Sequence, residues 1–269
     1  MSTSHCPILL INLASSRGRL QRCAEQLTRC GLSFERIEAV DGRKLHQEDL
    51  EEVHPTGTPG YFMPLKSTEI GCYLSHVRAL QRMIELDLDH ALIMEDDFEL
   101  GPNFAERLGH VVAALGENHD QVRLEGEFGH YLLERKLPNG DCLVRYQHPL
   151  TRALAILWTR RGARKFLQVA HPIRRPVDVQ FKHWWEGDLQ ISYVLPELVR
   201  VHEPSASLST IGKRKAKGLV TRLRRLHYCL QFSLLSHLRQ LPRLGLGRMA
   251  RQRFRALPPP QRKGLILPS

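Results

Sequence analysis

The chain has 269 residues, 42% of them apolar, so it can bury a sizeable core as one large domain or one domain with an appendage. It contains no run of 18 or more apolar residues, which excludes a transmembrane helix. The formal net charge is +11, unevenly placed: residues 211–269 carry 15 Lys or Arg and no Asp or Glu, whereas the remaining 210 residues carry 24 basic and 28 acidic residues.

The first elements of the chain are predicted from apolar runs and capping residues. Residues 7–13 (PILLINL) form a continuous apolar run, typical of a strand covered on both faces. No basic segment or cleavage pattern accompanies it, so we expect a core strand and not a signal peptide. Ser15 or Ser16 can cap a helix that Gly31 ends, and residues 33–40 follow as a second strand.

The middle of the chain alternates loop, helix and strand. The pair Asp41-Gly42 reads as a turn, and residues 54–66, with three prolines and two glycines, as a loop. Apolar residues at helical spacing predict a helix over residues 67–87. Residues 90–95 (HALIME) then form a buried strand.

The next elements follow the same alternation. Asn103, with Glu106 three residues later, is expected to cap a helix. Residues 122–124 indicate a short strand, residues 153–159 (ALAILWT) a buried strand, and residues 160–170 a helix.

The pattern as a whole predicts the fold class. Residues 171–187 are expected to be irregular, and residues 189–194 are expected to form the last strand. Alternation of strands and helices favours an α/β fold with a mainly parallel sheet flanked by helices. Residues 1–210 are therefore assigned to one domain, and residues 211–269 to a basic amphipathic tail that is partly disordered or associates with a membrane.

The tail carries a stripe of leucines at helical spacing between basic residues. The stripe consists of Leu219, Leu223, Leu226, Leu230, Leu234, Leu238 and Leu241. The flanking basic residues are Arg222, Arg224, Arg225 and Arg239. This pattern is typical of a helix at a membrane interface, and a core-packing helix with a solvated basic face is the alternative. The charge alone would also suit nucleic acid.

The six cysteines form no CxxC pair. They are Cys6, Cys23, Cys30, Cys72, Cys142 and Cys229. We expect reduced, mostly buried thiols in a cytoplasmic protein, with a zinc site as the alternative.

The buried strand 90–95 ends in the acidic triplet Glu95-Asp96-Asp97. In open α/β sheets, ligands bind beyond the carboxyl ends of the strands. Adjacent carboxylates repel one another, so a bound divalent ion is the natural reason to cluster them, and it would also hold a diphosphate. The alternative is the start of a solvated loop.

Several segments in fixed order resemble one family. They are ILLINLASSRGRL (8–20), FERIEAVDG (34–42), STEIGCYLSHVRAL (67–80), ALIMEDDFEL (91–100) and TRRGARKFL (159–167), with weaker matches at PVD (176–178) and ELVRVHEPSAS (197–207). Together they resemble glycosyltransferase family 25, which includes bacterial lipooligosaccharide galactosyltransferases and collagen galactosyltransferases. The resemblance covers roughly residues 7–210, so the tail lies outside it.

The resemblance implies a GT-A-type fold, a sugar-nucleotide donor, commonly UDP-galactose, and a divalent metal ion, usually Mn²⁺. The acidic triplet corresponds to the DxD-like motif of the family. Asp97 is then the first candidate metal ligand and Glu95 the second, while Asp96 is expected to meet the ribose or the sugar. His202 resembles, by position, a late metal or phosphate ligand of GT-A enzymes.

Three further positions are expected near the nucleotide through the same resemblance. They are Asn12, Arg17 and Asp41. Arg17 is suited to bind phosphate or stack on a base, and a surface salt bridge is its alternative. Asp41 on its own would indicate only the turn that it forms with Gly42.

The segment STEIGCYLSH supplies Glu69, Ser75 and His76, which match the family and place this helix beside the donor. Without the resemblance, His76 would be interpreted as a core histidine with a hydrogen-bond partner.

Family members of bacterial type are mostly taken as inverting enzymes, which need a general base for the acceptor hydroxyl. Asp178, in the match PVD, is the candidate base, and its alternative role is to cap a helix over residues 179–184. Trp184 and Trp185 are candidates to stack on a sugar ring, and either could equally belong to the core.

The resemblance thus implies a metal-dependent, inverting transfer of a hexose, galactose first, from a UDP-sugar to a lipooligosaccharide or another glycan. The basic tail would bring the protein to the inner face of the cytoplasmic membrane as a peripheral protein of lipopolysaccharide biosynthesis. Two alternatives stay open: a nucleic-acid-binding protein that uses the tail, and a nucleotide-sugar-binding protein without turnover.

Overall fold

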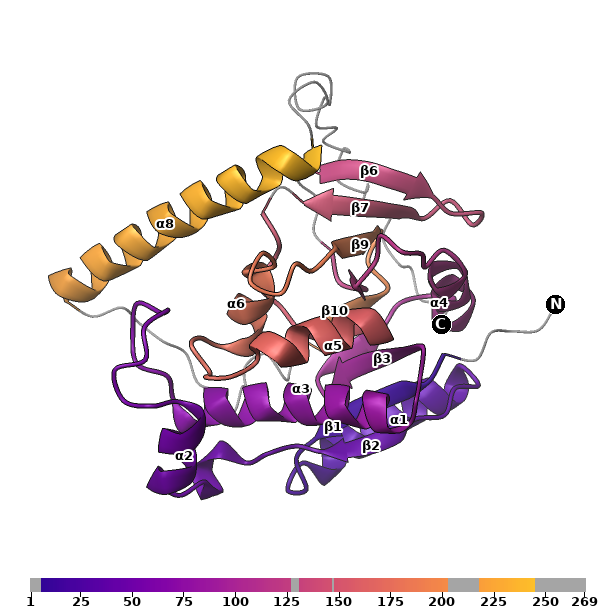
Figure 1. Ribbon diagram of the computed structural model, residues 1–269. Helices are drawn as coiled ribbons and strands as arrows, with labels where there is room; N and C mark the ends of the chain where they lie inside the picture. The colour runs from indigo at the N-terminus through magenta and orange to yellow at the C-terminus, as the bar shows by residue number, and fades with distance from the viewer. Residues whose placement is uncertain (1–5, 127–130, 147, 203–217, 245–269) are drawn as a thin grey trace.

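The computed structural model describes residues 6–126, 131–146, 148–202 and 218–244. A central eight-stranded sheet lies between two layers of helices (Figure 1). Its strands are β1 (Ile8–Asn12), β2 (Glu35–Glu38), β3 (His90–Glu95), β5 (Gln121–Arg123), β6 (Tyr131–Lys136), β7 (Cys142–Tyr146), β8 (Ala155–Thr159) and β9 (Ile191–Leu195). A small second sheet pairs β4 (Phe98–Leu100) with β10 (Val199–Val201).

The helices follow the strands in the chain and cover both faces of the sheet. They are α1 (Arg17–Arg29), the short 3₁₀ helix η1 (Gly42–Lys44), α2 (Gln47–Val53), α3 (Ser67–Glu85), α4 (Phe104–Ala113), α5 (Arg160–Val169), α6 (Val177–Lys182) and α8 (Leu219–Leu244). Side chains of α3, α5 and α6 share one core cluster, and those of α1 and α4 share a second cluster on the opposite face of the sheet.

The strand order is β2-β1-β3-β8-β5-β9-β7-β6. The strands β1, β2 and β3 are mutually parallel, as are β5 and β9, whereas β8 and β7 run antiparallel to their neighbours. The predicted α/β class with a mainly parallel sheet is therefore confirmed. The carboxyl ends of β1, β3 and β5 meet at one edge, and this edge receives the acidic triplet.

The alternation of side chains along β1 explains why the first strand is apolar throughout. Ile8 and Leu10 point into the cluster with α1 and α4, whereas Leu9 and Ile11 point into the cluster with α3. All four are at most 7% exposed. A strand that is covered on both faces needs apolar residues at every position, which is the pattern of residues 7–13.

Two glycines allow η1 to lie directly against the start of α3. A Cβ at Gly42 would stand 1.8 Å from the carbonyl oxygen of Ser67, and a Cβ at Gly71 would stand 2.6 Å from the carbonyl oxygen of Val40. Backbone therefore packs on backbone here, which brings the loop after β2 to the edge of the sheet where β1 and β3 end.

Some sequence predictions were incomplete or wrong. The β6–β7 hairpin, α2, β4 and β10 were not predicted, and β10 shows that the strand at 189–194 is not the last. Residues 171–187 are not wholly irregular, because they contain α6. Asn103 precedes α4 as expected, but its left-handed backbone (φ 54°) gives no side-chain cap. A hairpin signal was present, since Asn139-Gly140 lies between β6 and β7, with Gly140 at φ 89°.

The helix α8 contains the leucine stripe and lies along one side of the molecule (Figure 1). Six leucines of the stripe, Leu219 to Leu238, are exposed by 52–72%. The helix contacts the body through other side chains, with Tyr228 and Phe232 against aromatic rings of the body. The alternative of a core-packing leucine stripe is therefore wrong for these six residues. Predictions for residues 203–217 and 245–269 lie outside the described residues.

Within the described part of the chain, none of the helices combines the length and the apolar character that crossing a membrane requires. All six cysteines are free: Cys6 and Cys23 are buried, Cys229 is exposed, and the other three are intermediate.

Candidate active site

A hollow lies where β1, β2 and β3 end, between η1 and α3. Polar side chains from all of these elements face it. The polar lining residues include Asn12, Arg19, Asp41, Arg43, Thr68, Cys72, Ser75, His76, Glu95, Asp96 and Asp97. The sheet edge and α3 thus gather most of the residues that the sequence singled out, although they come from four separate segments of the chain.

Asp96 is held by side chains from β1 and α1. Its carboxylate accepts a hydrogen bond from Asn12 Nδ2 at 2.6 Å and pairs with Arg19 at 2.9 Å. Its backbone carbonyl accepts from Arg22 at 2.9 Å and from the thiol of Cys23 at 3.3 Å. Both side-chain oxygens of Asp96 are therefore bound within the protein, and these contacts hold the triplet in place.

The side chain of Asp97 differs from that of Asp96 in its hydrogen bonding. Its Oδ1 is buried and has no hydrogen-bond partner among the described residues. Burial, together with the negative charges of Glu95 and Asp96, raises the pKa of Asp97 to about 7. The backbone N–H of His202 donates to the carbonyl oxygen of Asp97 at 2.7 Å, because β10 pairs with β4 directly after the triplet. The antiparallel pair thus brings His202 beside Asp97.

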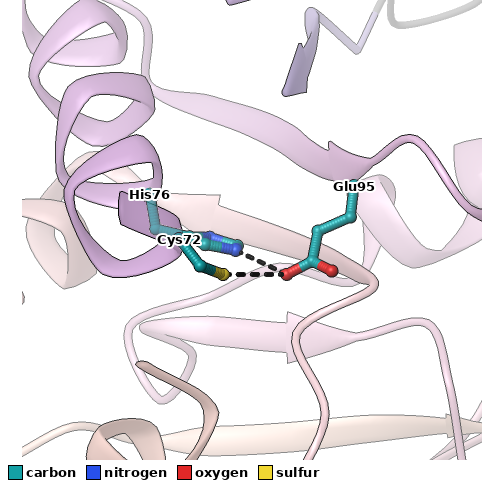
Figure 2. Close-up of side chains that lie close together, drawn as sticks. All are labelled: Cys72, His76 and Glu95. Atoms are coloured by element: carbon teal, nitrogen blue, oxygen red, sulfur yellow. Dashed lines mark hydrogen bonds and ion pairs between the residues drawn. The ribbon is translucent and has the colours of Figure 1, made fainter. Parts of the chain in front are cut away.

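Glu95 is oriented by two residues one turn apart on α3 (Figure 2). His76 Nε2 donates to Glu95 Oε1 at 2.9 Å, and the thiol of Cys72 donates to the same oxygen at 3.8 Å. His76 is 1% exposed, and burial, followed by the charge of Glu95, raises the pKa of the Cys72 thiol well above its ordinary value. A protonated thiol and an imidazole N–H both act as donors here, so they fix Oε1 and leave the second oxygen for another partner.

This set of groups fits a divalent cation. An unpartnered buried carboxylate oxygen costs free energy unless a cation or a donor reaches it, and Asp97 Oδ1 is in that position. Oxygen ligands are those that Mg²⁺ and Mn²⁺ prefer. Cys72, His76 and Glu95 also place three ligand atoms within 4.8 Å of one another. Because the thiol and the imidazole are already bound to Glu95, we interpret them as support for this carboxylate.

Asp41 and Ser75 form the opposite side of the hollow. The carboxylate of Asp41 caps η1 and binds the side chain of Arg43 at 2.7 and 2.8 Å, which lowers the pKa of Asp41. The hydroxyl of Ser75 accepts from the backbone N–H of Val40 at 2.8 Å and donates to the carbonyl of Gly71. Ser75 therefore ties the loop after β2 to α3.

Two of the residues expected near the donor lie elsewhere. Arg17 is exposed at the start of α1 and does not line the hollow, whereas Arg19, two residues later, does. The carboxylate of Glu69 accepts from the backbone N–H of Lys66 at 2.8 Å and closes a capping box at the start of α3. Glu69 thus supports the helix that lines the hollow and is not itself part of the lining.

Asp178 lies in the first turn of α6, a helix that packs against α3. The ring of Phe181 meets the ring of His76 edge to face at 5.8 Å. Burial, followed by the charge of Glu95, raises the pKa of Asp178, while the backbone N–H of Val179 donates to its carboxylate at 2.8 Å. Trp184 is buried in the core, whereas Trp185 is only partly buried and faces α8.

The sequence analysis missed two buried charged residues at the end of β5, Arg123 and Glu125. The guanidinium of Arg123 lies over the rings of Phe181 and Tyr193, at 5.6 and 5.5 Å from their centroids. Glu125 is 2% exposed, and burial raises its pKa to about 8. The signal was available, because Glu125 follows a short strand as Glu95 ends β3. Cys72 could have been found as well, since it stands four residues before His76 on one helix face.

Comparisons with known proteins identify the family of the chain. The family model described as glycosyltransferase family 25 (LPS biosynthesis protein) matches residues 5–181. A glycosyltransferase 25 family member of Anopheles gambiae is 33% identical over 193 residues, which are 66% of this chain and 31% of that protein. Procollagen galactosyltransferase 2 of Homo sapiens is 32% identical over 125 residues, which are 45% of this chain and 19% of that protein.

Not every relative is described as an active enzyme. A probable inactive glycosyltransferase 25 family member 3 of Bos taurus is 28% identical over 217 residues, which are 71% of this chain and 36% of that protein. The chain thus spans about a third or less of the length of these three relatives. A solved structure, a glycosyltransferase involved in the glycosylation of the major capsid of PBCV-1, covers 61% of this chain and 63% of its own, at a TM-score of 0.33 and 11% identity. Because the family model covers well over half of the chain, the chain belongs to glycosyltransferase family 25.

Proposed function

We propose that the chain transfers a hexose, with galactose as the first candidate, from a UDP-sugar to a hydroxyl group of a lipooligosaccharide or another glycan, with Mn²⁺ as cofactor. The observation that carries this proposal is the unpartnered, buried Oδ1 of Asp97 at the carboxyl edge of the sheet. It stands beside a second carboxylate, Glu95, that α3 holds by one oxygen only.

The residues divide into a metal side and a nucleotide side. Asp97 and Glu95 would hold the ion, with His202 as a further candidate ligand, and the bound ion would supply positive charge for the leaving diphosphate. Arg19 and Asp41 line the nucleotide side together with Ser75. Asn12 acts through Asp96, whose carboxylate it binds at 2.6 Å.

Asp178 is the proposed general base. In an inverting transfer, the carboxylate of Asp178 accepts the proton of the acceptor hydroxyl. The hydroxyl oxygen of the acceptor bonds to the anomeric carbon of the donor sugar at the same time as the bond from that carbon to the diphosphate breaks. A base works best when its pKa approaches the working pH, and burial raises the pKa of Asp178 in that direction.

The test is a screen of UDP-sugars in the presence of Mn²⁺. A donor that binds the native state raises the melting temperature by mass action, and the same mixtures can be assayed for released UDP. We expect one UDP-hexose to give the largest shift, and chelation of the ion by EDTA to abolish it. If no UDP-sugar shifts the melting temperature or releases UDP, the transferase proposal is wrong. Binding without UDP release would favour the alternative of an inactive nucleotide-sugar-binding protein.

The leucine stripe of α8 supports a peripheral position at the cytoplasmic membrane face. From Leu219 to Leu241 six steps span 22 residues, so the stripe repeats about every 3.67 residues and stays on one side of a straight helix. Arg222 and Arg224 are exposed beside it. An exposed apolar stripe with basic borders suits an anionic membrane surface.

Vesicle flotation tests this position. Vesicles of phosphatidylcholine with phosphatidylglycerol should bind the full chain, and vesicles of phosphatidylcholine alone should bind it less. The variant Leu226→Glu with Leu230→Glu changes two residues that are 57% and 61% exposed, so it should fold and lose binding. Binding that survives this change would remove the stripe from the interface. Tight, salt-dependent binding of bulk DNA that competes with the vesicles would favour the nucleic-acid alternative.

A further inference from the structure

A second cavity lies on the other side of α6 from the hollow, between α6, the loop before α3 and α8. Its volume is about 420 Å³, within the range of about 300–1,000 Å³ that small-molecule sites occupy. The residues that line it are Tyr61, Phe62, Met63, Thr151, Val179, Lys182, Arg225, Tyr228, Cys229 and Phe232. Four of the ten come from α8, so this helix completes the cavity.

The helix α6 lies between α3 and the cavity. One side of it packs against α3, where the ring of Phe181 meets the ring of His76 at 5.8 Å. Its other side contributes Val179 and Lys182 to the cavity. Asp178 stands in the first turn of the same helix, directly before Val179. The charge of Asp178 acts both on Cys72, which lines the hollow, and on Lys182, which lines the cavity, so the proposed base lies near both sites.

The residues that line the cavity carry positive and no negative charge. Lys182 and Arg225 line it, and none of the lining residues is acidic. Among the described residues, neither cation has a carboxylate within the 4.0 Å of an ion pair. The ammonium of Lys182 lies 4.9 Å from the ring centroid of Phe232, and burial lowers the pKa of Lys182. Lys182 is partly buried, whereas Arg225 is exposed at the rim. Two cations without an ion pair at one cavity favour an anionic ligand.

Aromatic side chains supply the rest of the wall. The ring centroids of Tyr61 and Tyr228 lie 5.5 Å apart, and those of Phe62 and Tyr228 lie 5.7 Å apart. Phe232 lies at the other end, 5.4 Å from Trp185. Flat apolar faces beside hydrogen-bonding cations suit a pyranose ring, which has C–H surfaces and polar edges.

We infer that this cavity binds the acceptor, and that the acceptor is a sugar with an anionic group, phosphate or carboxylate, held by Lys182 and Arg225. The inference rests on the proposed transferase function, since it assigns the second substrate of the same reaction. The family match ends at residue 181, so both cations lie beyond the matched segment.

Binding of matched sugars tests the inference. Calorimetry with the full chain, Mn²⁺ and UDP should compare methyl galactoside with galactose 6-phosphate and with galacturonic acid. At least one charged sugar is expected to bind about tenfold more tightly than the neutral one, as a single charge-assisted contact would provide. The comparison of galactose 6-phosphate with galacturonic acid identifies which anionic group is preferred. Inorganic phosphate alone should bind more weakly than the phosphosugar, because it cannot use the aromatic wall.

Variants on α8 and α6 locate the charge effect. Arg225→Gln and Lys182→Gln should each remove most of the tenfold preference and leave binding of the neutral sugar unchanged. Arg222→Gln is the matched control, because Arg222 is exposed on the same helix and does not line the cavity. Donor binding, measured by the melting shift with a UDP-sugar, should not change in any of the three variants.

Four results would overturn the inference. They are equal binding of charged and neutral sugars, no binding of any of the three, equal binding of inorganic phosphate and the phosphosugar, and an equal loss in the Arg222→Gln control. A UDP-sugar that binds normally while these results hold would leave the transferase function standing. Conversely, a charge preference without any donor binding would refute the transferase function and leave an anionic-sugar site.

Discussion

The two sites on either side of α6 are built by different means. Around the hollow, short polar contacts fix almost every functional group: Asn12 and Arg19 hold Asp96, and His76 holds Glu95. The cavity beside α8 is instead lined by aromatic rings at centroid distances of about 5–6 Å, with two unpaired cations.

The difference fits the ligands that we propose for the two sites. A diphosphate and its ion carry concentrated charge, so their ligands gain from being fixed before binding, and a network of hydrogen bonds fixes them. A sugar acceptor offers apolar faces and dispersed hydroxyl groups, so rings tolerate more variation in its shape. We therefore expect changes at the hollow to abolish the reaction, and changes at the cavity to alter which acceptor is used.

Of the variants at the two sites, Asp97→Asn should reduce activity most. The change removes the negative charge of the first candidate metal ligand while it keeps the shape of the side chain. We expect metal-dependent donor binding to vanish and UDP release to fall by about a thousandfold, equivalent to about 4 kcal/mol. The free energy of unfolding should not fall, because burial and two neighbouring carboxylates already disfavour the Asp97 charge.

Melting curves with and without Mn²⁺ and a UDP-sugar measure the donor effect. Glu99→Gln is the control, since Glu99 is exposed two residues later in β4. Unchanged activity in Asp97→Asn would remove this residue from the metal site and reopen the alternative of a solvated loop start.

Asp178→Asn should separate the two sites functionally. The variant keeps the fold of α6 and lacks a base, so the rate of transfer should fall by about a hundredfold or more while donor binding persists. Single-turnover transfer and the melting shift with the donor distinguish these quantities. Asp178→Glu keeps a carboxylate and should recover part of the rate. If the asparagine variant loses donor binding instead, Asp178 belongs with the metal ligands.

The sequence predicted the hollow better than the cavity, for a physical reason. Each segment at the hollow is a strand end or a helix face, where apolar periodicity marks the element and polar residues mark its edge. By that rule, the acidic triplet lies at the end of β3, and His76 lies on the predicted helix that became α3. The roles of Asp96 and Glu69 could not be predicted, because they depend on partners such as Arg19 and the Lys66 backbone.

The cavity depends on contacts between distant segments. Tyr61 and Phe62 lie in a loop, Lys182 in a helix that was expected to be partly irregular, and Phe232 on the face of α8 opposite to the leucines. No spacing in the sequence relates these positions to one another. The leucine stripe was visible in the sequence, whereas its exposure follows only from the aromatic contacts that fix the other face of α8.

Gly42→Ala tests whether the hollow depends on the close packing of η1 against α3. A Cβ there would stand 1.8 Å from the Ser67 carbonyl oxygen, so η1 must move away from α3. We expect a loss of about 1–3 kcal/mol in the free energy of unfolding, as for other overpacked sites, and weaker donor binding because Asp41 moves with η1. Urea denaturation measures the first effect. Gly109→Ala is the control, since a Cβ at Gly109 meets nothing within 4 Å. Equal stability of the two variants would mean that η1 can move away from α3 at little cost in free energy.

Glu125→Gln should have the smallest effect on the reaction, because Glu125 does not line the hollow, and an effect on stability that depends on pH. Burial raises the pKa of Glu125 from 4.5 to about 8, with Arg123 opposing this shift and Glu95 adding to it. The native state therefore keeps a proton that the unfolded chain releases above pH 4.5, so the free energy of unfolding falls as the pH rises through this window, by up to about 1.4 kcal/mol per pH unit. Glutamine carries no titrating group, so the variant should lose this slope and gain stability relative to the parent as the pH approaches 8. Urea denaturation at pH 5, 6.5 and 8 measures the slopes, with exposed Glu117→Gln as the control. Parallel slopes in parent and variant would show that Glu125 is ionised in the native state.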